Sequence, residues 1–195
     1  MNSNKTTELV DVKSRKEWRA WLKKNHANVP GVWLVLYKKN SGEKRISYSE
    51  AVEEALCFGW IDSKPNTLDE TRFKLKFTPR KPKSVWAKTN KERVKRLIEV
   101  GLMTDAGMKK IEAAKLDGSW DSLNGIDSMQ IPADFKKALS VNKRAKRNFG
   151  AFSDSSKKII LYWIQSAKRP ETRERRVKET VSLAARNIKA NHYRQ

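Results

Sequence analysis

The stretch RFKLKFTPRKPKSVW, residues 72–86, alternates basic with apolar residues and then runs through a Pro-rich basic segment to a tryptophan. Side chains alternate between the two faces of a strand, so its cations and its apolar residues fall on opposite faces. The apolar face carries Phe73, Leu75 and Phe77. The basic face carries Arg72, Lys74 and Lys76. Because like charges on one face repel one another and the stretch contains no acid, we expect the basic face to meet an anion.

The segments around this strand predict a small sheet with helices. Residues 60–64 and 72–77 read as two strands joined by a polar loop, which favours an antiparallel hairpin. A further strand, rich in branched and aromatic residues, is predicted at 32–40. The spacing of apolar residues predicts helices at 14–25, 47–59, 84–101 and 104–116.

Local signals mark several of these helix boundaries. Ser47 and Glu50 form the pattern of a capping box, in which each side chain binds the other residue's backbone N–H. Gly59 follows the same helix and is predicted to end it, because glycine readily adopts the left-handed conformation found there. Ser84 is predicted to cap the helix at 84–101.

The composition changes at DGSWDSLNGIDSMQ, residues 117–130, which contains no basic residue and is predicted to be a linker. Beyond it, all apolar spacing is helical. We therefore predict an α+β protein with two domains. The N-terminal domain, residues 1–116, has a small, mostly antiparallel sheet with helices, and the C-terminal domain, residues 131–195, is all helical.

The net charge of +21, from 43 basic and 22 acidic residues, is the strongest compositional signal. Such a surplus attracts polyanions or anionic ligands, and a generic basic surface is the alternative. Residues 136–148 contribute six cations and no acid, which fits either a phosphate-binding surface or ordinary solvated helices.

The remaining composition excludes several classes of site. A single cysteine, Cys57, rules out an internal disulfide and fits a reducing cytoplasm. The first ten residues lack an apolar signal core, and the longest apolar run, 32–37, is far too short to span a membrane. We therefore expect a soluble, cytoplasmic protein. With only His26 and His192 as imidazole ligands, no metal site and no cofactor are predicted.

Three segments resemble a known family: EALCFGWIDS (54–63), FTPRKPKSVWAKTNKERV (77–94) and WIQSAKRPETRERRVKETV (163–181). On these segments the chain resembles the YdeI/OmpD-associated family, also called bacteriocin-protection proteins, over about residues 10–190. The resemblance implies a small bacterial cytoplasmic protein whose helical C-terminal part is the namesake domain. It implies no agreed reaction, cofactor or catalytic residue, and it leaves open whether any bacteriocin resistance is direct.

The basic strand and the loop after it form the leading candidate site. Between Arg72 and Arg96 there are eleven Lys or Arg and one acid, Glu92. Loop cations before a helix N-terminus suit a phosphate, and tryptophans beside them could stack on a base. The candidate ligand-binding residues are Trp60, Arg72, Lys74, Lys76, Arg80, Lys83 and Trp86. The alternatives are that the tryptophans are core residues and that Asp62, Asp69 and Glu70 neutralise part of the charge.

Cys57 and Asp62 are weaker candidates for catalysis. Cys57 stands near a helix C-terminus, where the dipole disfavours a thiolate, so a buried inert thiol is the alternative. Asp62 could act as a general base, or it could hold Arg72 across the hairpin.

These patterns favour a non-enzymatic protein that binds an anion, either nucleic acid or a phosphorylated small molecule. The alternative is a small-pocket enzyme that uses Asp62 or Cys57 near the CFGWID segment. A third interpretation is an interaction module for an acidic protein partner.

Overall fold

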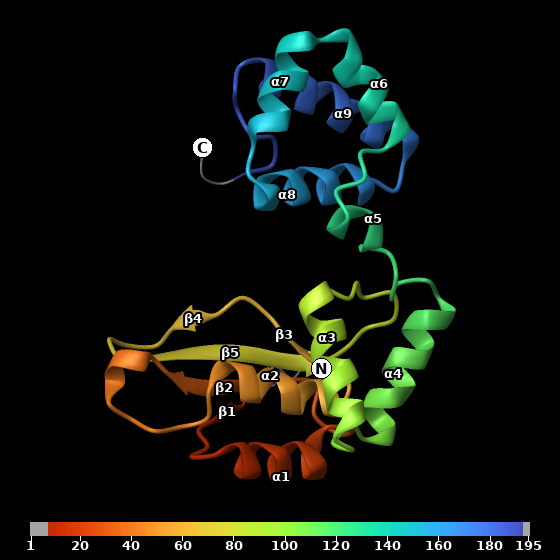
Figure 1. Ribbon diagram of the computed structural model, residues 1–195. Coiled ribbons are helices and arrows are strands. Elements are labelled where there is room, and N and C mark those ends of the chain that lie inside the picture. The colour runs from red at the N-terminus through yellow and green to blue at the C-terminus, as the bar shows by residue number, and fades with distance from the viewer. Residues whose placement is uncertain (1–7, 193–195) are drawn as a thin grey trace, which may run out of the picture. The chain divides into compact units, whose positions relative to one another are not determined.

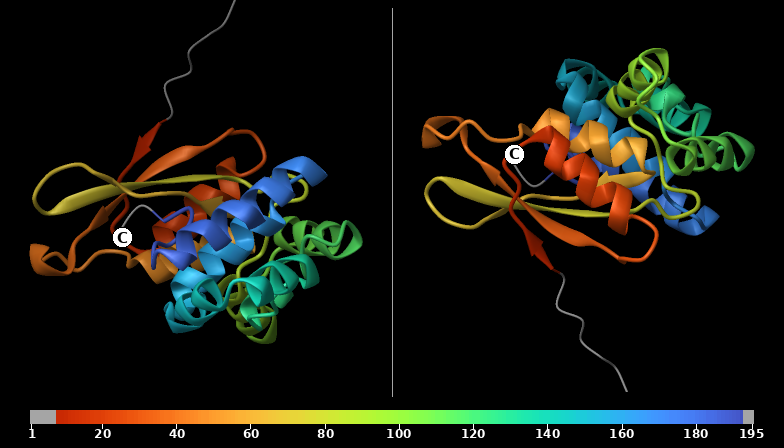
Figure 2. Two further views of the ribbon diagram at one scale, coloured as in Figure 1. Left: turned by 90° about the horizontal axis from the view of Figure 1, so that it is seen from above. Right: turned by 90° about the horizontal axis from the view of Figure 1, so that it is seen from below.

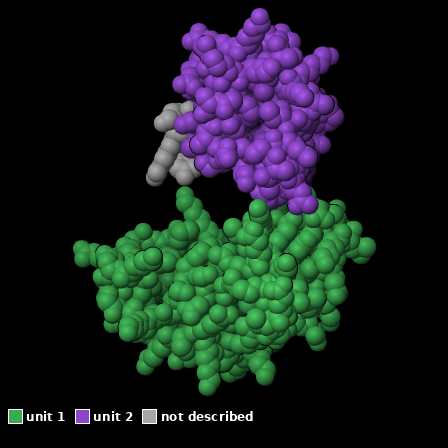
Figure 3. Space-filling view, viewed as in Figure 1, with its two compact units in different colours: residues 1–121 green, residues 122–195 purple. Residues whose placement is uncertain are grey.

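The computed structural model describes residues 8–192 of the chain. The chain divides into two compact units, unit 1 (residues 1–121) and unit 2 (residues 122–195), which are coloured separately in Figure 3. Unit 1 has a small sheet with helices and the described part of unit 2 is helical, so the α+β prediction is confirmed. The domain limits at 116 and 131 stay a prediction.

A five-stranded sheet organises unit 1 (Figure 1). Its strands are β1 (Leu9–Val10), β2 (Val32–Tyr37), β3 (Trp60–Asp62), β4 (Asn66–Thr67) and β5 (Arg72–Pro79). The order is β1-β2-β5-β3, with β4 also paired to β5. Only the β1–β2 pair is parallel among the described strands, and β2, β3 and β4 all run antiparallel to β5. The predicted pairing of 60–64 with 72–77 is thus confirmed, and β5 is the strand that joins the sheet together.

The helices of unit 1 are α1 (Arg15–Asn25), α2 (Tyr48–Cys57), α3 (Lys88–Glu99) and α4 (Asp105–Leu116), with a 3-10 turn η1 (Lys39–Ser41) after β2. Helices α1 and α2 cover one face of the sheet and lie side by side in the view from below (Figure 2).

The predicted helix boundaries hold in two cases and fail in one. The capping box of Ser47 and Glu50 is formed, and Gly59 follows α2 with φ of 73°. The cap predicted at Ser84 is wrong, because α3 begins at Lys88 after an Ala87 N-cap that has no side-chain hydrogen bond. The Ser84 hydroxyl instead donates to the Lys81 carbonyl at 2.6 Å and so closes the loop before the helix.

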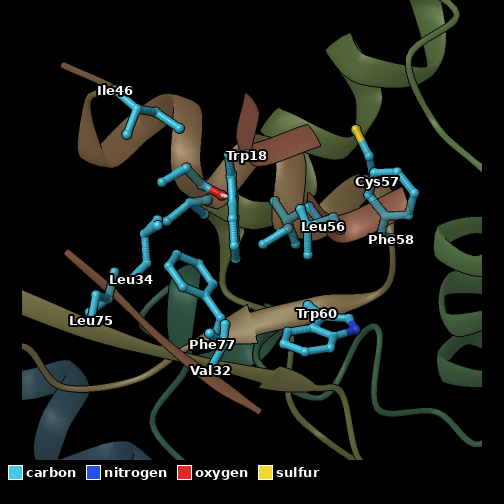
Figure 4. Packing of buried hydrophobic residues seen from close by; sticks show 14 of the residues in the cluster. Trp18, Val32, Leu34, Ile46, Leu56, Cys57, Phe58, Trp60, Leu75 and Phe77 are labelled. Atoms are coloured by element: carbon cyan, nitrogen blue, oxygen red, sulfur yellow. Dashed lines mark hydrogen bonds between the residues drawn. The ribbon is translucent and has the colours of Figure 1, made fainter. Parts of the chain in front are cut away.

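The core of unit 1 lies between the sheet and helices α1 and α2 and extends to buried residues of α3 and α4 (Figure 4). Leu75 and Phe77 of β5 are buried there, which confirms the alternation expected for this strand. Trp18 of α1 packs against Phe77 with ring centroids 5.4 Å apart, and its indole N–H donates to the Ala51 carbonyl of α2 at 3.0 Å. One face of β5 is therefore committed to the core, and the basic face points the other way.

An ion-pair network that the sequence did not predict joins α1, α2 and α3. Glu54 of α2 is 1% exposed and accepts hydrogen bonds from Arg15 Nε and Arg19 Nη1, both at 2.6 Å. Its neighbour Glu53 accepts from Arg15 at 3.1 Å and also pairs with Arg96 of α3. The network links three helices around the carboxyl end of α2.

Unit 2 is built from α5 (Asn124–Asp127), α6 (Ala133–Val141), α7 (Lys143–Ala151), α8 (Asp154–Gln165) and α9 (Pro170–Ala185). Its own core includes Phe135, Leu139, Phe149, Ile160 and Ile164. The stretch predicted as a linker contains α5, whose Ile126 is buried in this core. None of the described helices is both long enough and apolar enough to cross a membrane.

Candidate functional site

Lys74 and Lys76 lie on the sheet face opposite the core, where Trp33 of β2 stands between them. In the β2–β5 register Lys76 pairs with Trp33 and Lys74 with Val35. Their ammonium groups lie 4.9 Å (Lys74) and 5.9 Å (Lys76) from the Trp33 ring centroid, within the range of a cation–π contact. Within residues 8–192 neither lysine forms an ion pair, so both charges remain available to an external anion.

Arg72, at the start of the same face, is already paired. Its Nε lies 2.7 Å from Asp69 Oδ2, and Asp69 Oδ1 accepts backbone N–H bonds from Thr71 and Arg72. The bond from Arg72, aided by these N–H groups, lowers the pKa of Asp69 to about 2. Asp69 therefore neutralises Arg72, as the alternative from sequence allowed, and we leave Arg72 out of the candidate site.

Arg80 follows β5 and is buried, with only 2% of its surface exposed. Its guanidinium stacks on the Trp86 ring at 3.6 Å, and Nη1 donates to the Val85 carbonyl at 3.2 Å. Nε and Nη2 are buried, and no described residue accepts a hydrogen bond from them. Burial lowers the pKa of Arg80 to about 10, so the group still carries its charge at neutral pH. Native proteins rarely leave such donors unpaired.

A small cavity lies beside Arg80, with a volume of about 60 Å³. Its lining includes Arg80, Lys81, Lys83, Lys110, Asp117 and Ser119. Four of these side chains are cationic and one is anionic. We refer to this site as the Arg80 cavity. A water needs about 10–15 Å³ by this measure, so the cavity has room for a few waters or one oxyanion but not for a nucleobase.

Asp117 fixes the loop that walls the Arg80 cavity. Its two carboxylate oxygens accept backbone N–H bonds from Ser119 at 2.9 Å and from Lys83 at 3.1 Å. A hydrogen bond from the Ser119 side chain, together with these two backbone bonds, lowers the pKa of Asp117. Lys83 is held at φ of 60°, a left-handed conformation that is uncommon for a residue other than glycine. Strain of this kind often marks binding loops.

Trp60 and Trp86 do not offer a surface for a base, because each is only 1% exposed. The Trp60 indole N–H donates to the His26 carbonyl at 3.1 Å, and Trp86 packs on Trp120 with centroids 4.9 Å apart. The stacking role expected for these two residues is therefore corrected to a core role, which the sequence had left as the alternative. Trp86 still contributes to the site indirectly, because it supports Arg80.

The two weaker catalytic candidates are occupied or shielded. Cys57 is fully buried, and burial together with the charge of Glu54 raises the pKa of its thiol to about 11. Asp62 accepts a hydrogen bond from the Tyr48 hydroxyl at 3.0 Å. The alternative that it holds Arg72 across the hairpin is wrong, since Asp62 is opposite Phe77 in the sheet and Arg72 pairs with Asp69. Neither group is among the residues that line the Arg80 cavity, although the charge of Asp62 acts on Arg80 and partly opposes the effect of burial on its pKa.

Cys57 is expected to react with a thiol reagent at about pH 8 at least about 100-fold more slowly in the native protein than in urea, because the native thiol is both shielded and protonated. Its folded pKa exceeds the unfolded one, so its contribution to stability is present below pH 9 and is lost as pH rises toward 11. Rapid native labelling would contradict the placement of Cys57 in the core.

Within residues 8–192, no three His, Cys, Asp or Glu side chains gather closely enough to hold a metal ion. The four cations around the Arg80 cavity would also repel one. The arrangement suits an anion.

Two family models match the chain. Residues 10–110, more than half of the 195 residues, match the family described as Domain of unknown function (DUF8412). The chain belongs to this family. Residues 128–187 match the family described as Bacteriocin-protection, YdeI or OmpD-Associated, which confirms the resemblance for the C-terminal part. Searches of the curated proteins and of the solved structures found no match.

These matches divide the three segments on which the resemblance was based. Segments 54–63 and 77–94 fall in the DUF8412 part, and segment 163–181 falls in the YdeI/OmpD-associated part. The match to the YdeI/OmpD-associated family is therefore shorter than the expected range of about 10–190. Neither description names a ligand or a reaction, and the chemistry of the site therefore depends on its geometry.

Sequence reasoning missed several residues of unit 1 that shape the site. They are Trp33, Lys110, Asp117 and Ser119. The sequence did contain a signal for Trp33, because this residue lies in the predicted strand at 32–40, and that strand pairs with β5. The other three come from α4 and the turn after it, and no spacing in the sequence relates that region to Arg80.

Proposed function

We propose that the protein binds a phosphorylated small molecule, whose terminal phosphate enters the Arg80 cavity. The observation that carries the proposal is the pair of buried Arg80 donors, Nε and Nη2, that lack an acceptor among the described residues. A buried unpaired donor costs about 1–3 kcal/mol, and more when it is charged. An oxyanion would accept from both atoms at once, since the two N–H groups of a guanidinium edge match two phosphate oxygens.

The size of the Arg80 cavity favours a phosphomonoester over a nucleic-acid backbone. A volume of about 60 Å³ accommodates one phosphate group with the rest of the ligand outside. A phosphodiester has two substituents, and both would have to leave a cavity walled by residues 81–84 and by α4. A terminal phosphate needs only one exit. The single negative side chain of the lining, Asp117, already accepts backbone N–H bonds from Lys83 and Ser119.

Lys74 and Lys76 extend the positive field along the face of β5 that leads to Arg80. Residues 74, 76 and 78 have the same parity, so the strand alternation places them on one side, and Arg80 follows directly after the strand. These lysines attract an anionic ligand toward the cavity and are not needed to hold its phosphate. The proposal places the protein in the cytoplasm, which agrees with its one cysteine being a buried free thiol.

Methyl phosphate and dimethyl phosphate, titrated by calorimetry at low salt, test the proposal. We expect the monoester to bind and the diester to bind at least about tenfold more weakly. Arg80→Lys should weaken the monoester about 10- to 100-fold, because lysine cannot form the paired bonds. Lys110→Gln, a change at a less buried position of the lining, should weaken binding of the monoester several-fold. This second variant keeps the proposal testable if Arg80→Lys does not fold. Lys39→Ala, at an exposed position in η1, is the matched control and should bind normally.

Two results would overturn the proposal. One is equal binding of both esters. The other is tight, salt-dependent binding of a single-stranded oligonucleotide that the double change Lys74→Ala and Lys76→Ala abolishes and Arg80→Lys does not. That outcome would make the sheet face, and not the cavity, the site, with nucleic acid as the ligand.

A further inference from the structure

Unit 2 contains a pocket of about 430 Å³ between α6, α7 and α8 and the segment that precedes α6. The residues that line it include Met129, Ile131, Leu139, Phe149, Gly150 and Leu161, with Lys136, Lys146 and Lys157 among the polar ones. We refer to it as the unit 2 pocket. Its volume falls in the range of sites that hold small organic ligands. It lies wholly within the YdeI/OmpD-associated part of the chain.

Gly150 keeps one side of the unit 2 pocket open. It lies within α7, where glycine costs about 1 kcal/mol relative to alanine. A Cβ built at this position meets no atom within 4 Å, and its backbone does not require a glycine. The fold of unit 2 therefore gives no packing reason for glycine here. Its effect is to leave space beside Phe149 and Leu139, which are buried.

The rim of the unit 2 pocket is positive. Lys136 of α6 and Lys146 of α7 are exposed, and neither forms an ion pair with a residue in the described range. Lys157 is partly neutralised by Asp154, whose carboxylate lies 3.9 Å away. The surrounding unit carries 17 basic and 6 acidic residues, so it favours a negative ligand.

We propose that the unit 2 pocket binds an apolar monocarboxylate, such as a medium-chain fatty acid. The hydrocarbon body would fill the apolar floor, and the carboxylate would stay at the rim with Lys136 and Lys146. This pairing of an apolar volume with unneutralised cations at its edge suits a ligand that has one charged end. A nucleotide or sugar phosphate fits poorly, because the floor offers it few hydrogen-bonding groups. This site and its ligand are separate from those of the Arg80 cavity.

Decanoate and decanol, titrated against the full chain below their aggregation limits, test this inference. We expect decanoate to bind at one site per chain and decanol to bind about tenfold more weakly. Gly150→Trp should fill the space and weaken decanoate at least about tenfold. Gly150→Ala, the matched control, should retain binding within about threefold and should not destabilise α7.

Charge recognition is tested separately by the double change Lys136→Gln and Lys146→Gln. It should weaken decanoate about tenfold and leave decanol unchanged. Both positions are exposed, so folding should be retained. The inference is overturned if decanoate does not bind, if Gly150→Trp binds it as tightly as the native chain, or if the lysine changes weaken both ligands equally.

Discussion

Replacement of Glu54 by glutamine is expected to lower the free energy of unfolding of unit 1 by about 3 kcal/mol, because it leaves two arginines beside a buried neutral group. The Glu54 side chain is 2% exposed, and Arg15 and Arg19 each bind it at 2.6 Å. Loss of one partner from a buried ion pair typically costs about 3–5 kcal/mol. The lower end applies here, since the arginine side chains are 32% and 33% exposed and water can reach them.

Urea unfolding followed by tryptophan fluorescence measures this effect, because six of the seven tryptophans are in unit 1. Glu70→Gln is the matched control, since Glu70 is exposed and its backbone carbonyl, which the change keeps, accepts a hydrogen bond from Lys38. The control should change stability by less than about 0.5 kcal/mol. Equal midpoints for the two variants would mean that the Glu54 network contributes nothing to the fold.

The sequence predicted those features of unit 1 that depend on neighbouring residues. The alternation of β5 follows from strand geometry, so Leu75 and Phe77 were placed in the core correctly. The capping box at Ser47 and the end of α2 at Gly59 depend on contacts within four residues and on a backbone preference. Each of these signals can be read without knowing where the rest of the chain lies.

Features that depend on distant residues could not be read in this way. Arg15 and Glu54 are 39 positions apart, and nothing in either segment indicates that they pair. Arg80 looked like one more exposed loop cation, and its burial depends on the stack with Trp86 and on residues of α4. The predicted set of cations therefore separated into a neutralised Arg72, two open lysines on the sheet, one buried arginine and Lys83, which lines the cavity beside that arginine.

The junction between α2 and α4 is another contact between residues distant in sequence, and a single methyl group added at Gly107 tests it. The Cys57 carbonyl at the end of α2 accepts hydrogen bonds from the Thr104 hydroxyl at 2.6 Å and from the Thr104 N–H at 3.2 Å. Gly107, one turn later, packs directly on the same carbonyl. A Cβ at Gly107 would overlap the Cys57 carbonyl and would lie 2.7 Å from Met103 Cε. The methionine can move, but the carbonyl is backbone and already hydrogen-bonded.

Gly107→Ala is therefore expected to destabilise unit 1 by about 2–3 kcal/mol, although helix propensity alone predicts a gain of about 1 kcal/mol. The reverse change at an exposed position of the same helix, Ala113→Gly, is the control and should cost about 1 kcal/mol. The urea midpoints of both variants measure these changes in the free energy of unfolding. Since α4 also lines the Arg80 cavity, Gly107→Ala should weaken binding of methyl phosphate as well. If Gly107→Ala is more stable than the native chain, α4 does not pack closely against the end of α2. The contact between Gly107 and the Cys57 carbonyl would then not fix the wall of the Arg80 cavity.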